Sequence, residues 1–502
     1  MLDEEKDDAV ADLPNHCSGA VPVDGDDPAY MVRWDPSEDA NPQNWKPIYK
    51  SWITFQLSQL ALAASVTSSM IAPANHIIAE YIGVSDTVAV LNVSLFVVGF
   101  CVGPLLWGPL SEVFGRRVSL IPPMVALALF SVGTGFSRNA ASVFITRFFS
   151  GVFGSAPVSN VNAALGDCFS RESRGLPVSL YAVAVVGGPT LGPVIGAALT
   201  VSLNWRWTQY IGAIWVAAST FVCYFCLPEV YGPYLLGKKA QRLRNETGDQ
   251  RLWHPHERIK VDVGSIITKQ LSRPIKMLTT EPMVTCICFY ASFVFAILYL
   301  TLEVFTIIFR DIRQWSVFNA SLPFLGSFTG IVLALVINVG NQPRYKRISR
   351  EAGGKAVPEA RCPPMAIGGT LMVIGLFLLG WTADPRYHWI LPVVATGFIG
   401  AGFNTTFQQC LNFLVDTYGI YAASATAANT FLRSLFAAGL PLAARPMFKN
   451  LGVGPACSVL GGIAVALLPV PFLFMRYGLQ LRKMSKFAPV EEDDEKKPAP
   501  PT

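Results

Sequence analysis

Charged residues are scarce in this chain. Asp, Glu, Lys and Arg together make up 15% of its 502 residues, whereas an ordinary soluble protein contains roughly 25%. Hydrophobic residues make up 52%, and apolar runs recur along almost the whole length. Because about 20 apolar residues suffice to cross a bilayer, this composition excludes an ordinary soluble globular protein and indicates many membrane spans.

An apolar core is lacking at the N-terminus, so residues 1–30 do not read as a signal peptide. This segment is acidic, and the tail after Ser485 is equally polar. We expect both to be disordered and cytosolic. A membrane enzyme such as a prenyltransferase would need paired aspartate clusters at the cytosolic rim, and the sequence has none, so we do not expect an enzyme. The modest net charge of +5 gives no reason to expect a nucleic-acid partner.

The ten cysteines do not predict a metal site or a structural disulfide. Cys223 and Cys226 are close in sequence, as are Cys286 and Cys288, but no histidine or further cysteine pair accompanies them. No two cysteines fall in predicted external loops, where a disulfide would form. Small apolar packing residues are the default interpretation, and we expect neither a metal nor a cofactor.

The apolar runs predict an all-α integral membrane fold with twelve transmembrane helices in two six-helix bundles. A polar, basic segment at 228–281 separates the two sets of six, which is the pattern of a duplicated bundle. The predicted division is 1–47 (disordered), 48–227 (first bundle), 228–281 (central loop), 282–478 (second bundle) and 479–502 (disordered tail). The predicted helices cover residues 50–72, 87–107, 118–136, 142–165, 176–200, 208–227, 283–307, 317–339, 364–382, 389–414, 420–443 and 454–476.

Lysine and arginine gather in alternate loops, and the positive-inside rule converts this asymmetry into an orientation. Arg116 and Arg117 lie between predicted helices 2 and 3, and a basic cluster at 344–361 lies between helices 8 and 9. We expect this side to be cytosolic, with both termini inside. The chain is then a multi-pass protein of the cell membrane, with the vacuolar membrane as the alternative.

Residues 108–117 read GPLSEVFGRR and lie between predicted helices 2 and 3. Gly108 and Gly115 permit a tight turn and a close approach of helices, while Glu112, Arg116 and Arg117 lie at the cytosolic rim. A positive-inside loop explains the arginines alone, but not an acid between two glycines at this spacing. The segment resembles the loop signature of the major facilitator superfamily, G-x-L-x-D-x-x-G-R-R/K, with Glu112 where the superfamily usually has Asp.

Further motifs follow in the order of that family. Residues 147–151 (RFFSG), which begin with Arg147, resemble its R-x-x-x-G signature on helix 4. Residues 188–196 (GPTLGPVIG) resemble the antiporter signature G-x-x-x-G-P-x-x-G on helix 5, carried by Gly188, Gly192, Pro193 and Gly196. Residues 41–45 (NPQNW) and 227–231 (LPEVY) resemble fungal segments. Together these motifs resemble the fungal twelve-helix drug:proton antiporters, over nearly everything from Trp34 to Lys486.

The resemblance implies a monomer in the lipid bilayer that exports a small organic compound in exchange for protons. It implies that the glycine–proline run of helix 5 seals the two halves, and that the cytosolic loop is a latch. In this latch Glu112 lies near the start of helix 11, and Arg116 or Arg117 reaches Asp167. The alternative is a proton-coupled uptake permease of the same fold, which would be expected to lack the helix 5 pattern.

Three charged residues fall inside predicted spans: Arg147, Glu303 and Arg433. A charge at bilayer depth costs ~2.5–3.5 kcal/mol, so each should face a cavity or a partner. Helices 7 and 11 are neighbours in this fold, and we expect an ion pair between Glu303 and Arg433. Glu303 is the first candidate for the coupled proton, with hydration at the membrane rim as the alternative. Arg147 and Arg433 would position Glu303, bind an anionic substrate group, or tie helices together.

Amide and aromatic side chains are the candidates for a substrate cavity. Asn404, Gln408 and Asn412 recur at a spacing of four and share one face of helix 10, and Asn429 stands four residues before Arg433 on helix 11. These amides would bind a substrate or another helix. Tyr290, Phe293 and Tyr299 of helix 7 face lipid, the core, or a bulky and partly aromatic substrate.

Overall fold

A computed structural model of the chain describes residues 30–35, 37–170, 173–258, 272–353, 356–485 and 487. Within these ranges the regular structure is helical, apart from one isolated bridge between Met31 and Trp253. The predicted all-α class is therefore confirmed. Of the segments expected to be disordered, 1–47 and 479–502, residues 1–29 and 488–502 lie outside the described residues. Residues 42–44 form a short helical turn, and residues 479–484 are the last part of a helix that begins at Pro469.

The long helices form two groups in chain order. The first group is α2 (Pro47–Ser69), α5 (Leu91–Phe114), α6 (Arg116–Phe136), α7 (Ala140–Cys168), α8 (Gly175–Ser202) and α9 (Trp205–Cys226). The second group is α13 (Pro282–Phe305), α15 (Pro323–Gly340), α17 (Cys362–Thr382), α18 (Ile390–Tyr418), α19 (Ala422–Leu451), and α20 with α21 (Val453–Leu467 and Pro469–Met484). Shorter helices join them: α3 (Asn75–Ile82), α4 (Asp86–Ala89), α10 (Gly232–Thr247), α12 (Arg273–Thr280), α14 (Val317–Ser321) and α16 (Gln342–Glu351).

In the described part of the chain, eleven helical stretches are long and apolar enough to cross a membrane. Helix α19 falls outside that set because polar residues, including Asn429, Arg433 and Arg445, lower its mean hydropathy. It is nevertheless 30 residues long, which corresponds to roughly 45 Å and exceeds the bilayer core. Since α19 packs along α13 and α5, it takes its place as the twelfth helix of the bundle.

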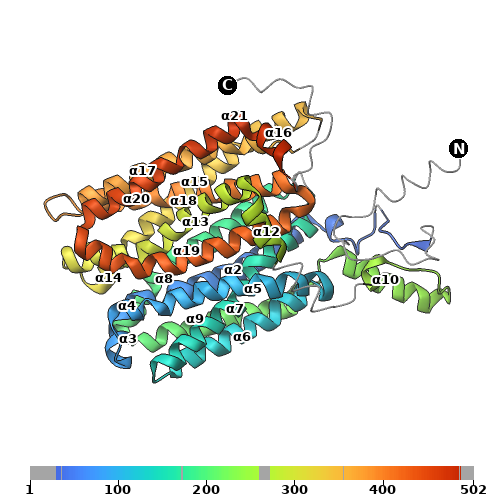
Figure 1. Cartoon of the computed structure of the whole chain (residues 1–502). Coiled ribbons are helices and arrows are strands. Elements are labelled where there is room, and N and C mark those ends of the chain that lie inside the picture. The colour runs from blue at the N-terminus through green and yellow to red at the C-terminus, as the bar shows by residue number, and fades with distance from the viewer. Residues whose placement is uncertain are drawn as a thin grey trace.

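The two groups lie side by side, and the apolar core has two clusters, the larger of which includes residues of both groups. Residues of α2, α5, α6, α7 and α9 form one cluster, and a larger cluster centres on α13, α18 and α19. The groups meet where α5 packs on α19 and α8 packs on α15. In Figure 1 the first group (blue to cyan) and the second (yellow to red) form two neighbouring layers, with α3, α4 and α14 at one end and α10 beyond the other. We call these ends the α3–α4 end and the loop-cap end.

Helix α13 is the most enclosed element of the second group. Every residue from Tyr290 to Phe305 is buried, although the side chain of Phe289 is 41% exposed. Beyond Phe305 the chain continues as a π-helical turn over Thr306–Ile312. A helix buried on all sides lies in the interior of a bundle rather than against lipid, so the aromatic side chains of α13 face protein.

Several helices end beyond their predicted ends, among them α18 at Tyr418 and α21 at Met484. Two of the differences affect the motifs and charges considered above. Helix α5 continues through GPLSEVF as far as Phe114, so Gly108 is helical and Gly115 alone makes the turn, with φ of 89°. Helix α19 continues to Leu451, beyond the predicted end at 443. Hydropathy marks only the apolar part of a helix, and both helices extend past it into more polar sequence.

The glycines of α8 bring this helix against α2. A Cβ on Gly188 would lie 2.3 Å from Ser65 Cβ, one on Gly192 would lie 2.1 Å from Ser69 Oγ, and one on Gly196 would lie 1.9 Å from the Met70 carbonyl oxygen. Small residues permit such close helix packing. The atoms nearest to these three glycines belong to the first group, whereas a Cβ on the neighbouring Gly187 would meet Phe328 of the second group. That this run seals the two halves stays a prediction.

The segments at 30–35 and 232–258 form what we call the loop cap. Val32, Leu236 and Ala240 make a small apolar cluster there, and Lys239 Nζ lies 2.6 Å from Glu38 Oε2. His256 Nε2 lies 3.0 Å from the carbonyl oxygen of Glu112 on α5, which attaches the cap to the first group. Burial lowers the pKa of His254 to about 4 and also lowers the pKa of His256, so both rings are neutral at pH 7.

Candidate functional site

Glu303 is buried at the α3–α4 end, where it is 4% exposed. Arg445 Nε donates to Glu303 Oε2 at 3.1 Å, and Asn75 Nδ2 donates to Oε1 at 3.4 Å. The expected ion pair with Arg433 is therefore wrong, as is the alternative of a hydrated carboxylate at the rim. The partner is Arg445, which the predicted boundaries left outside helix 11.

The level of each residue along its helix explains this difference. Helices α13 and α19 run in the same direction, because Phe295 lies beside Arg433 and Glu303 lies beside Arg445 further along. Glu303 is 21 residues after the first residue of α13, whereas Arg433 and Arg445 are 11 and 23 residues after the first residue of α19. At a rise of about 1.5 Å per residue, only Arg445 reaches the level of Glu303.

The bonds of Glu303 continue to a second carboxylate of the first group. Arg445 Nη1 lies 3.2 Å from Asp86 Oδ2, and Asp86 Oδ1 lies 2.9 Å from His76 Nδ1. We call Asn75, His76, Asp86, Glu303 and Arg445 the Glu303 network. Its inner end is shielded and its outer end reaches solvent, since the side chains of Glu303, Asp86 and His76 are 6%, 35% and 44% exposed. The network joins the two groups of helices.

Arg147 ties helices together within the first group. Its Nε donates to the carbonyl of Asn92, and its two terminal nitrogens donate to the carbonyls of Thr67 and Ser68. The guanidinium also lies 4.5 Å from the ring centroid of Phe96. Of the three roles considered for this arginine, the geometry supports the tie between α7, α5 and α2.

Arg433 has a different environment near the middle of the bundle. It is 7% exposed, and its guanidinium lies 4.6 Å from the ring centroid of Phe295 and 5.2 Å from that of Phe407. Its Nε has no hydrogen-bond partner within the described residues. Four residues earlier on α19, the buried Asn429 amide has only the weak contact of the Cys288 thiol as a polar partner in the described part of the chain.

The amides of α18 are directed to a neighbouring helix. Asn404 Nδ2 donates to the carbonyl of Ile331 at 3.0 Å, and Gln408 Oε1 accepts from Asn338 Nδ2 at 2.8 Å. Gln409 Nε2 in turn donates to Asn338 Oδ1 at 2.8 Å. These bonds favour the helix-tying interpretation of Asn404 and Gln408 over the substrate-binding one.

The three aromatic candidates of α13 lie inside the protein. Tyr290, Phe293 and Tyr299 are 2%, 4% and 1% exposed. The hydroxyl of Tyr299 lies 3.4 Å from Ser68 Oγ of α2, so it contacts the first group. Of these three side chains, Tyr299 lies at the seam between the groups, close to Arg433.

The predicted latch residues hold a set of contacts within the first group. Arg116 Nε lies 2.9 Å from Asp167 Oδ2, so Arg116 is the arginine that reaches Asp167. Arg117 donates instead to the carbonyl of Tyr224. The structure adds Glu229, whose carboxylate accepts the backbone N–H groups of Arg116 and Arg117 at 2.9 and 3.0 Å. An acid at a helix N-terminus is favourable. No role for the glutamate of LPEVY was predicted from the sequence.

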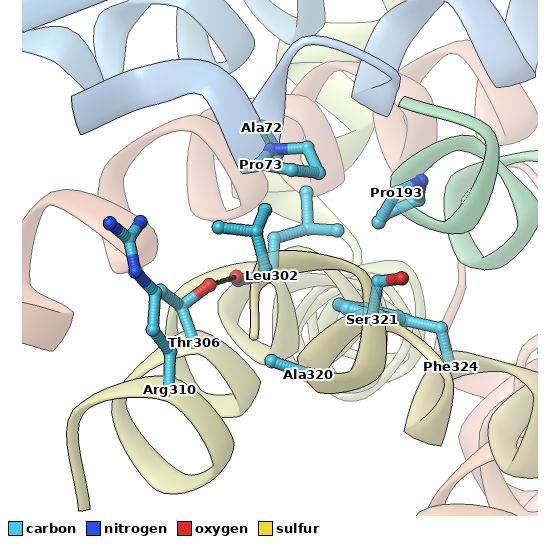
Figure 2. A pocket seen from close by; sticks show the side chains of 10 residues that line it. Ala72, Pro73, Pro193, Leu302, Thr306, Arg310, Ala320, Ser321 and Phe324 are labelled. Atoms are coloured by element: carbon cyan, nitrogen blue, oxygen red, sulfur yellow. Dashed lines mark hydrogen bonds between the residues drawn. The ribbon is translucent and has the colours of Figure 1, made fainter. Parts of the chain in front are cut away.

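A pocket opens at the seam of the two groups near the α3–α4 end. Its cavity volume is about 20 Å³. Figure 2 shows Ala72 and Pro73 from the turn after α2 and Pro193 from α8 facing Leu302, Thr306 and Arg310, with Ala320, Ser321 and Phe324 beside them. Pro193 of the antiporter signature therefore faces the second group, unlike the glycines around it.

Comparison with known proteins places this architecture in a family. A family model described as Major Facilitator Superfamily matches residues 57–441. The multidrug transporter FLU1 of Candida albicans is 38% identical over 477 residues, covering 94% of this chain and 78% of the relative. The efflux pump MFS2 of Trichophyton rubrum is 40% identical over 465 residues, covering 91% and 77%.

Two further comparisons agree with this assignment. The citrinin biosynthesis cluster transporter mrr1 of Monascus ruber is 38% identical over 467 residues, covering 92% of this chain and 93% of the relative. A solved inward-open structure of the xylose transporter XylE from E. coli is 16% identical, with a TM-score of 0.60 over 88% of this chain and 97% of that one. The latter supports the fold alone. This chain therefore belongs to the Major Facilitator Superfamily and is a multi-pass membrane transporter rather than an enzyme.

Proposed function

We propose that this transporter exports a small organic compound, such as a drug, toxin or secondary metabolite, in exchange for protons. The names of its relatives support export, since they include a multidrug transporter, an efflux pump and a biosynthesis cluster transporter. The distribution of lysine and arginine supports a loop-cap end in the cytosol and an α3–α4 end outside. The plasma or the vacuolar membrane would host the protein.

The proposal that protons drive transport rests on the Glu303 network. A buried carboxylate in the membrane is costly unless it is paired or protonated. When charged, Glu303 holds Arg445 of its own group and Asn75 of the other. Protonation removes the negative charge that holds Arg445. The solvent-reaching pair of Asp86 and His76 supplies a route from the external side.

Transport would proceed by rocking of two six-helix halves, 48–227 and 282–478, about a site near mid-membrane. The contacts between the groups at the α3–α4 end include Arg445 with Asp86 and Asn75 with Glu303. A proton on Glu303 would weaken the contact with Asn75 and leave Arg445 held by Asp86 alone, so it would change the contacts that join the two groups at the external side. A ligand changes such an equilibrium only by interacting differently with the two states, and the proton meets this condition here.

Efflux from living cells tests the direction and the energy source. Fungal cells that lack their own efflux pumps would express the chain and be loaded with a panel of fluorescent or radiolabelled drugs. The proposal expects faster efflux of at least one compound, and loss of this difference when a protonophore is added. Net accumulation of the compound would identify an uptake permease instead, and efflux that is insensitive to the protonophore would rule out proton coupling.

A further inference from the structure

Arg433 is a buried cation without an acidic partner. No hydrogen bond or ion pair of this side chain occurs within the described residues, and it is 7% exposed. The titratable side chains near enough to act on its charge are Tyr299, Tyr181 and Cys101. A phenol or a thiol of ordinary acidity carries little or no negative charge at neutral pH, so none of them balances the guanidinium.

Two other arginines inside the predicted spans or their extensions, Arg147 and Arg445, have polar partners. Arg147 donates to three backbone carbonyls, and Arg445 contacts two carboxylates. Arg433 has only the faces of Phe295 and Phe407. A cation–π contact returns part of the cost of a buried charge, but an unpaired charge in the membrane remains expensive and commonly marks a functional site. Among the described residues, Arg433 is therefore a buried charge that has neither a counter-ion nor a hydrogen-bond acceptor.

The surroundings of Arg433 come from both groups of helices. Cys101 lies on α5 and Tyr181 on α8, whereas Tyr299 lies on α13. Phe295 and Phe407, whose ring centroids are 5.4 Å apart, form an aromatic wall beside the cation. Asn429 lies four residues before Arg433 on the same face of α19, and in the described structure the polar group near its amide is the Cys288 thiol, a weak hydrogen-bond partner. At the seam where the halves would move, this position therefore offers a ligand the guanidinium of Arg433, an amide and aromatic rings.

We propose that Arg433 binds the acidic group of the transported compound, and that this compound is an aromatic carboxylate. The planar guanidinium matches a carboxylate with two parallel hydrogen bonds. Phe295 and Phe407 contact the aromatic part of the substrate, and Asn429 offers a donor and an acceptor to its other polar groups. The proposal rests on the proposed export function for the statement that the bound compound is the one transported, whereas binding itself does not depend on that function.

Thermal stability without ligand gives the first test. Arg433→Met removes an uncompensated charge and keeps most of the side-chain volume, so the ligand-free protein should have an unchanged or higher melting temperature. Arg147→Met is the matched control, and it should lower the melting temperature because it leaves three buried carbonyls without their donor. A melting temperature that falls as far in Arg433→Met as in Arg147→Met would show that Arg433 is a structural tie, which overturns the proposal.

Equilibrium binding to the purified protein gives the second test, without any pH gradient. The probes are benzoate, 2-naphthoate and anthracene-2-carboxylate, each compared with its uncharged amide. At least one carboxylate should bind about ten- to hundredfold more tightly than its amide, which is the range of a hydrogen bond to a charged group. This ratio should fall to about one in Arg433→Met and recover in part in Arg433→Lys, which restores the charge but not the fork.

Three results would overturn the proposal. They are no preference for any carboxylate over its amide, a preference that survives Arg433→Met, and a rise in melting temperature with chloride alone that equals the rise with the carboxylates. The last would identify an inorganic counter-ion. Charge-dependent binding together with an absence of proton-driven efflux would instead leave this site standing and refute the proposed export function. The two failures are therefore distinguishable.

Discussion

At the scale of single residues, the charges inside the spans were found from the sequence, but their partners were not. Arg147 and Arg433 look alike in sequence, since both are single arginines in apolar runs. One meets three carbonyls and the other meets aromatic rings. Which outcome applies depends on what neighbouring helices place at the same depth. Prediction of Arg445 as the partner of Glu303 depends on the correct end of α19, and hydropathy does not give that end.

Removal of Arg445 should destabilise the protein more than removal of an exposed arginine. Arg445→Gln leaves the buried Glu303 carboxylate without its cation, and breaking a buried pair costs about 3–5 kcal/mol, an upper bound here because the arginine side chain is 25% exposed. Arg386→Gln is the control, since Arg386 is 89% exposed and 3.8 Å from Asp384. Thermal unfolding in detergent measures both. Equal melting temperatures for the two variants would show that the Glu303 network contributes nothing to stability.

At the scale of elements, the sequence predicted the helices well and their faces less well. The number and order of spans follow from local hydropathy, which a single sequence contains. Gly188, Gly192 and Gly196 predict close packing of α8, but the sequence does not say on which helix, and they face α2 rather than the second group. The contacts of Glu229 with α6 join residues that are far apart in the chain, and the pattern LPEVY does not show them.

Bulk at Gly192 should disrupt the packing of α8 on α2. Gly192→Leu would push side-chain atoms into Ser69 and the carbonyl of Val66, and such overpacking costs about 1–3 kcal/mol. Gly462→Leu on α20 is the matched control, because a Cβ there meets nothing within 4 Å. We expect a lower melting temperature and lost export for the first variant alone. If both variants behaved like the parent, α8 would not be tightly packed at Gly192.

The loop cap should loosen on acidification. His254 has an ordinary pKa of 6.5 in the unfolded chain and a pKa lowered to about 4 by burial and by the neighbouring His256. Because its pKa is lower in the folded protein, the ring is protonated more readily in the unfolded chain. Stability is therefore fully present above pH 6.5 and is lost as the pH falls towards 4. Hydrogen exchange in α10 should therefore accelerate between pH 6.5 and pH 4, after correction for intrinsic rates.

Replacement of both histidines is the control for that measurement. In His254→Asn/His256→Asn the acceleration over this pH range should disappear, because no ring remains to be protonated. The amides of α7, far from the loop cap in sequence and buried in the first group, should not respond in either protein. An unchanged pH dependence in the double variant would assign the effect to other groups.

At the scale of the whole molecule, the all-α class, the division by a polar central segment and the family were all accessible from the sequence. They depend on hydrophobic length and on motifs such as GPLSEVFGRR, both of which are local. How the two groups of helices contact each other was not accessible. The charged link joins Asp86 to Arg445, which is 359 positions later in the chain, and Arg445 to Glu303. A proton would act on the relative position of the groups through this link.

Proton movement in liposomes tests this central claim most directly. The parent, Glu303→Gln and Glu80→Gln would each be reconstituted with a pH-sensitive dye inside and supplied with the compound that gave the largest protonophore-sensitive efflux in cells. Glu80→Gln is the control, since this acid is 71% exposed and 3.7 Å from His76. The account predicts proton movement opposite to the compound in the parent and in Glu80→Gln, and none in Glu303→Gln, which should still bind the compound. Proton movement in Glu303→Gln equal to that of the parent would contradict it.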